Sequence, residues 1–172
     1  MTHKLEVLSR AGLKSAIYLI VVALIIVFMG VLFFGAHHSD SSPWQDYDRT
    51  TITFDTGKEL EVVLANTPPL RTRGLSYSTS LAPNLGMLFI FEYQGEHGFW
   101  MKDMKYPIDI FWFDTHGALV FTQRNVSPDS FPKIFGDQIE SQYILETNVG
   151  VLADVQSIEK GIEHISTING ER

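Results

Sequence analysis

The stretch GFWMKDMKYPIDIFWFD, residues 98–114, places charged side chains within and between two apolar runs. Residues 98–101 and 108–114 are rich in aromatic side chains, which predicts two strands joined by a polar turn. Successive side chains of a strand point to opposite faces, so Asp109 should share a face with Phe111 and Phe113. A carboxylate among aromatic rings needs a hydrogen-bonding or charged partner. The stretch therefore predicts a β-rich fold in which Asp109 is partnered.

Similar short patterns recur through the rest of the chain. DTGK, residues 55–58, predicts a hairpin turn, and Thr67-Pro68 and Gly74 predict the start and the end of a short helix. The expected strands cover 51–54, 59–65, 86–91, 98–101, 108–114, 117–126, 143–148 and 162–168, and the expected helices cover 68–74 and 150–157. We expect a β-rich α+β domain, which is a small barrel-like or strongly curved, mostly antiparallel sheet with two short helices.

Residues 16–35, AIYLIVVALIIVFMGVLFFG, contain no charged side chain. About twenty apolar residues in a helix span the roughly 30 Å hydrocarbon layer of a bilayer. We therefore expect one N-terminal transmembrane helix. The alternative is a cleaved signal peptide, whose apolar core is typically about 7–15 residues long and ends at a small-x-small site. Phe33, Phe34 and Gly35 do not supply that site, which favours a retained anchor.

The residues that flank this segment predict its orientation. Lys4, Arg10 and Lys14 precede it, and positively charged residues stay on the cytoplasmic side of a membrane. We predict a single-pass protein of the inner or plasma membrane with four parts. These are a cytoplasmic segment 1–15, an anchor 16–35, a linker 36–50 and a periplasmic or extracellular β-rich domain 51–172.

The part of the chain after the anchor is acidic. The chain has 13 Lys and Arg and 20 Asp and Glu, of which residues 1–35 hold three and one; ten against nineteen remain, a net charge of −9 for residues 36–172. A nucleic-acid partner, which requires a basic face, is therefore not expected. The chain has no cysteine, which excludes disulfide bonds. No metal or cofactor is expected, because the histidines lack the spacing of a metal site and no phosphate-binding loop is present.

Six short motifs occur in order along the domain: VVLANTP, RTRGL, GMLFIF, FWMKDM, PIDIFWFD and YILETNVG. In this combination the chain resembles domain of unknown function family 192 over about residues 58–165. The resemblance implies a small β-rich fold that is often exported or membrane-anchored and that has no settled biochemical activity. The chain departs from the family pattern at Asp103-Met104, where the family has Asn-Thr, and at Ser76, where it has Met.

Five side chains are candidate ligand contacts: Arg71, Trp100, Lys102, Asp109 and Glu146. Glu146 shares a predicted strand face with Ile144, so its burial poses the same problem as that of Asp109. In one interpretation, Arg71 pairs with one of the two carboxylates and fixes the mouth of the barrel. In a second, the five line a pocket in which the indole is a flat wall and the charges orient a ligand. In a third, Asp109 and Glu146 form a catalytic carboxylate pair about 5–10 Å apart.

These interpretations correspond to three functions. The leading hypothesis is a membrane-anchored extracytoplasmic domain that binds a small polar, carbohydrate-like ligand or an envelope protein. The second is a carboxylate-dependent hydrolase that acts on envelope material, and the third is a purely structural envelope component. A cleft beside Trp100 and Lys102 favours the first function, whereas two carboxylates that face one open cleft favour the second.

Overall fold

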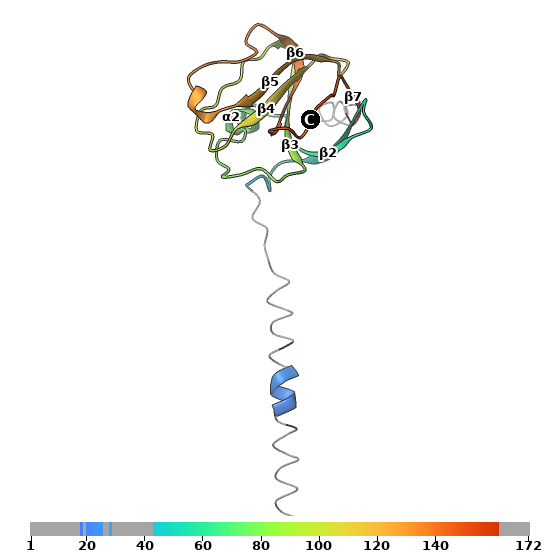
Figure 1. Ribbon diagram of the computed structural model, residues 1–172, viewed down its shortest axis with the longest axis vertical. Helices are drawn as coiled ribbons and strands as arrows, with labels where there is room; N and C mark the ends of the chain where they lie inside the picture. Colours follow the sequence, from blue (N-terminus) through green and yellow to red (C-terminus); the bar gives the residue numbers. More distant parts are fainter. Residues whose placement is uncertain (1–17, 19, 26–27, 29–42, 162–172) are drawn as a thin grey trace, which may run out of the picture. The chain divides into compact units, whose positions relative to one another are not determined.

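The computed structural model describes residues 18, 20–25, 28 and 43–161, and the folded domain begins at Pro43 (Figure 1). Among these described residues, no helix is both long enough and apolar enough to cross a membrane. The predicted segment 1–15, most of the anchor 16–35, the first part of the linker and the strand 162–168 lie outside the described residues. They stay predictions.

Within the described residues, one seven-stranded sheet forms the domain. Its strands are β1 (Arg49–Phe54), β2 (Glu59–Ala65), β3 (Leu85–Glu96), β4 (Ile108–Phe113), β5 (Leu119–Val126), β6 (Glu140–Asn148) and β7 (Ile158–Lys160). They lie in the order β5-β4-β6-β3-β2-β1-β7, and within the described residues β2 and β3 are the parallel pair. An isolated bridge from Ala118 to Ser157 brings the two edges of the sheet together. The predicted β-rich curved sheet is thus confirmed as a curled, mixed half-barrel (Figure 1).

The parallel pairing requires a crossover connection from β2 to β3, and the short helix α2 (Pro68–Arg73) lies in that connection. Pro68 occupies the first helical turn, where its missing N–H is not needed. Gly74 follows the helix with φ +49°, a conformation that favours glycine. The predicted start and end of this helix are therefore confirmed. A 3₁₀ turn, η1 (Pro128–Ser130), is the second short helix.

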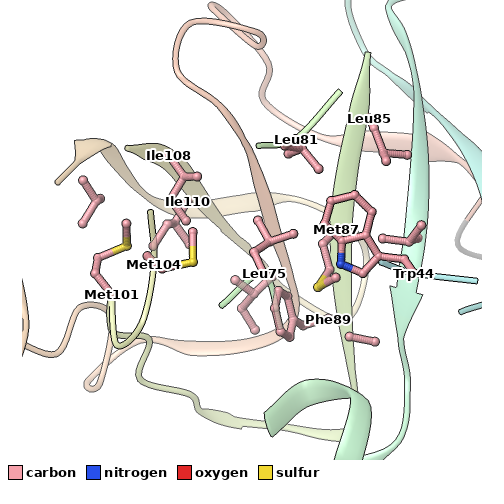
Figure 2. Packing of buried hydrophobic residues seen from close by; sticks show 14 of the residues in the cluster. Trp44, Leu75, Leu81, Leu85, Met87, Phe89, Met101, Met104, Ile108 and Ile110 are labelled. Atoms are coloured by element: carbon pink, nitrogen blue, oxygen red, sulfur yellow. The ribbon is translucent and has the colours of Figure 1, made fainter. Parts of the chain in front are cut away.

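Each face of the sheet carries its own hydrophobic cluster. The first cluster includes Met87 of β3, Ile110 of β4 and Ile144 of β6, and loops 74–85 and 97–107 add further side chains to it (Figure 2). The second cluster includes Leu88 and Leu145, the immediate neighbours of residues in the first. Adjacent residues alternate between the clusters because successive side chains of a strand point to opposite faces. This alternation decides which cluster each buried carboxylate meets.

Two predicted elements differ from the structure. Residues 98–101 form no strand, since Phe99 makes an isolated bridge with Phe135 and Met101 is buried in the first cluster from a loop. Residues 150–157 form turns instead of a helix, and from these turns Leu152 and Val155 fill the second cluster. In both segments the apolar residues that suggested regular structure are buried by irregular backbone.

The segment 43–50, which the sequence assigned to the linker, belongs to the folded unit. Trp44 and Tyr47 are buried in the first cluster, with exposed fractions of 4% and 5%. Tyr47 also donates its hydroxyl hydrogen to the carbonyl of Leu70 in α2, at 3.3 Å. Burial of both rings joins this segment to the helix and to the sheet.

Candidate functional site

Glu146 of β6 lies on the face of the first cluster, between Ile110 of β4 and Met87 of β3. The residue is 5% exposed, and within the described part of the chain its carboxyl group has no hydrogen bond and no ion pair, although its oxygen atoms are not among the fully buried polar atoms without a partner. Loss of water without a compensating partner disfavours the charged form, so burial raises the pKa of Glu146 to about 8. At neutral pH this side chain is therefore mostly a neutral acid with an O–H to donate.

Glu146 lies in the wall of a cleft of about 400 Å³. Helix α2, the loop that follows it, β3 and the loop 97–107 supply the rest of the lining. Three phenylalanines and one tryptophan contribute rings: Phe89, Phe91, Phe99 and Trp100. The rings of Phe89 and Phe99 meet edge to face with centroids 4.7 Å apart. Mostly apolar walls with a few polar groups, at this volume, are typical of small-molecule sites.

Three cations line the same cleft: Arg73, which donates to the carbonyl of Pro43, and the two whose contacts follow, Arg71 and Lys102. The Nη1 atom of Arg71 donates to the carbonyl oxygen of Ile90 at 2.8 Å, and the guanidinium lies 4.9 Å from the ring centre of Phe91. The Nζ atom of Lys102 lies 5.9 Å from the ring centre of Trp100. Neither Arg71 nor Lys102 forms an ion pair within the described residues. Arg71 thus connects α2 to β3 through a backbone carbonyl, and the predicted pairing of Arg71 with Asp109 or Glu146 is wrong.

Asp109 lies on the opposite face of the sheet, where it closes a β-bulge. The register of β4 and β5 shifts between Ile108 and Ile110, which leaves two residues of β5 opposite Asp109. Its carboxylate accepts hydrogen bonds from the backbone N–H of Asn125 at 2.7 Å and of Gly150 at 2.9 Å. Nη1 of Arg124 completes the set at 3.1 Å. Asp109 is buried and fully partnered, and its partner cation is Arg124.

The structure therefore divides the predicted site. Four candidates line the cleft: Arg71, Trp100, Lys102 and Glu146. Asp109 does not line it, because Asp109 pairs in register with Thr147, one residue beyond Glu146, and adjacent residues point to opposite faces. The two carboxylates consequently do not face one cleft, and the pair that the hydrolase interpretation requires is not formed.

Sequence patterns did not predict the phenylalanine side chains that line the cleft or the arginine beside Asp109. A signal for two of the phenylalanines was present, since alternation along GMLFIF puts Phe89 and Phe91 on one face of β3. No local signal marked Arg124, because the bulge that brings it to Asp109 depends on how two strands align.

Residues 50–163 match the model of the DUF192 family, which is described as "Uncharacterized ACR, COG1430". The chain belongs to the DUF192 family. This match confirms the resemblance that the six motifs indicated. No curated protein sequence matches the chain.

Two solved structures are similar to this DUF192 protein. One, from Sinorhizobium meliloti 1021, is titled a "putative transcription regulator"; it is 29% identical with a TM-score of 0.58, and the match covers 66% of this chain and 94% of that chain. The other is a protein of unknown function from Novosphingobium aromaticivorans DSM 12444. It is 22% identical with a TM-score of 0.58, and the match covers 66% of this chain and 85% of that chain. The second similarity supports the fold alone.

Proposed function

We propose that this DUF192 domain binds a small polar ligand in the cleft beside α2, and that residues 16–35 anchor it in the inner or plasma membrane. Glu146 is the observation that carries the proposed binding function. A buried carboxyl group without a partner costs stability, and a chain that needed only a stable sheet would have an apolar residue between Met87 and Ile110. A ligand that hydrogen-bonds to this group would supply the missing partner, which explains why a carboxyl group is present at this position.

The shape and chemistry of the cleft favour a small molecule over a macromolecule. Its volume of about 400 Å³ suits a ligand with one or two rings. Trp100 is 53% exposed, and its indole is a surface against which a sugar or another flat ring can pack. The acidic balance of residues 36–172 argues against nucleic acid, so the regulator title of the Sinorhizobium protein is not carried over.

The emission of Trp100 provides a direct test of binding. Trp44 and Trp112 are buried, so a ligand in the cleft changes mainly the fluorescence of Trp100. We expect members of a panel of sugars, sugar acids and small aromatic acids to raise the melting temperature and to change this emission. The Trp100→Phe variant should lose the emission change, and Thr72→Phe, which adds bulk to the lining, should lose both responses. Lys105→Gln, an exposed change in the neighbouring turn, serves as the control.

A panel that leaves both the melting temperature and the emission unchanged would contradict the proposed binding function. Melting shifts that persist in Thr72→Phe would place the binding site elsewhere. The anchor is tested separately with a reporter enzyme fused after Arg172. We expect activity outside the cytoplasm, and activity confined to the cytoplasm would overturn the proposed orientation.

A further inference from the structure

We propose that the ligand of this cleft is a small organic carboxylate with a ring-shaped body, held by Arg71, by Lys102 and by the Glu146 carboxyl group as a hydrogen-bond donor. This inference rests on the proposed binding function and narrows it to one chemical class. In this proposal the ligand carries a negative charge, and the protonated Glu146 side chain donates a hydrogen bond to it.

The donor and acceptor character of the lining carries the first step. Arginine and lysine side chains donate hydrogen bonds and accept none, and a protonated carboxyl group adds another donor. The nearby hydroxyl of Ser76 already donates to the carbonyl of Arg73 at 2.5 Å. A ligand group that satisfies these donors must present hydrogen-bond acceptors to them. A carboxylate does so, and its planar shape matches the fork of a guanidinium.

The charge of the cleft leads to the same conclusion. Glu146 is the one acidic residue among the described residues that line it, and burial raises its pKa to about 8, so the protonated form predominates at neutral pH. Arg71 and Lys102 therefore make the cleft positive within an otherwise acidic domain. The guanidinium of Arg73, the third cation of the lining, already donates from its Nη2 atom to the carbonyl of Pro43 at 3.0 Å. An anion gains from this arrangement, and a cation does not.

Groups around Glu146 determine how binding responds to pH. The strands beside it contribute Met87 and Ile110, which do not titrate. Tyr106, from the loop 97–107, is the phenol near enough to feel the charge of Glu146, and burial raises the pKa of this phenol. Ionisation of Glu146 therefore removes the donor and adds a repelling charge as the pH rises past about 8.

Matched acids and amides test the inference on the full chain. The probes are benzoate with benzamide and glucuronate with glucuronamide, and calorimetry measures their affinities. We expect at least one acid to bind more tightly than its amide, and its affinity to fall roughly tenfold between about pH 7 and about pH 9. Glu146→Gln should keep acid binding and lose the pH dependence, because its amide donates without titrating. Glu140→Gln, an exposed change on the same strand, should behave like wild type.

The cations are tested with the same probes. Arg71→Gln should weaken acid binding about tenfold and Lys102→Gln by up to about fivefold, with amide binding unchanged. Lys105→Gln is the matched control for Lys102, because it lies in the same loop and does not line the cleft. Phenyl phosphate bound more tightly than benzoate would overturn the carboxylate assignment in favour of a phosphate. Amides that bind as tightly as acids would overturn the carboxylate assignment, but the proposed binding function would stand. If none of these probes binds and other members of the larger panel do, the carboxylate assignment fails and the binding function again stands.

Discussion

Asp109 and Glu146 occupy neighbouring positions in the same sheet, and their surroundings are opposite. Asp109 faces the second cluster and accepts hydrogen bonds from two backbone N–H groups and one guanidinium. Glu146 faces the first cluster and has no such partner within the described residues. Burial alone therefore does not indicate function. A buried carboxylate with all its donors in place stabilises a backbone irregularity, whereas one without donors marks the place where a ligand can supply them.

The strongest test of this comparison removes the structural carboxylate. Asp109→Ala leaves the N–H groups of Asn125 and Gly150 without their acceptor and removes the carboxylate that pairs with Arg124. We expect the free energy of unfolding to fall by about 3–5 kcal/mol, because two backbone N–H groups lose their acceptor and a partly exposed guanidinium loses its partner. Denaturant titration measures the loss.

The control for this variant is Glu61→Gln, which breaks the exposed ion pair with Arg49 at 3.0 Å. That pair should contribute less than about 1 kcal/mol. If Asp109→Ala costs no more than Glu61→Gln, the bulge does not depend on its carboxylate, and the contrast between the two acids fails.

Removing the other carboxylate should have the opposite sign. The pKa of Glu146 is about 8 in the folded protein and 4.5 in the unfolded chain, so the folded state holds an extra proton between these values. Stability contributed by this group is therefore full below about pH 4.5 and falls by up to about 1.4 kcal/mol per pH unit until about pH 8. Glu146→Gln lacks this loss, and we expect it to be more stable than wild type by about 2–4 kcal/mol near pH 8.

The measurement is the difference in unfolding free energy between wild type and Glu146→Gln across this pH range. Glu140→Gln, an exposed change on the same strand, should give no pH-dependent difference. A Glu146→Gln variant that is less stable than wild type near pH 8 would mean that the carboxylate has a partner in the folded protein, and the cleft would lose its functional argument.

Much of this contrast could be predicted from single strands, and its decisive part could not. Alternation along PIDIFWFD correctly placed Asp109 with Phe111, and alternation along YILETN correctly placed Glu146 with Ile144. Alternation within one strand does not say which of its faces continues the face of the next strand. The register between β4 and β6 decides which faces match. It aligns Asp109 with Thr147, the neighbour of Glu146, so the two carboxylates lie on opposite faces of the sheet. The sequence therefore predicted both acids as buried and wrongly placed them in one site.

The loops were harder to predict for a related reason. Phe99 and Met101 are apolar residues that pack into the first cluster from a loop. Local sequence patterns do not distinguish such residues from those of a short strand. Helix α2 was predictable because Pro68 lies in its first turn and Gly74 follows its last residue, and the backbone preferences of both residues act locally. Features fixed by one residue's own backbone were predicted, and those fixed by contacts between distant segments were not.

The smallest expected effect compares the two arginines. Arg124 donates to Asp109 and to the carbonyls of Leu152 and Ala153, so Arg124→Gln removes donors from three acceptors. We expect it to lower the free energy of unfolding by about 1–2 kcal/mol, since the side chain is partly exposed. Arg71→Gln loses one bond to Ile90 and a ring contact with Phe91, and we expect a loss below about 1 kcal/mol. Parallel denaturant titrations of the two variants give the order. If Arg71→Gln is the more costly change, Arg71 serves mainly to hold α2 on the sheet, and Lys102 would be the remaining cation available for a ligand.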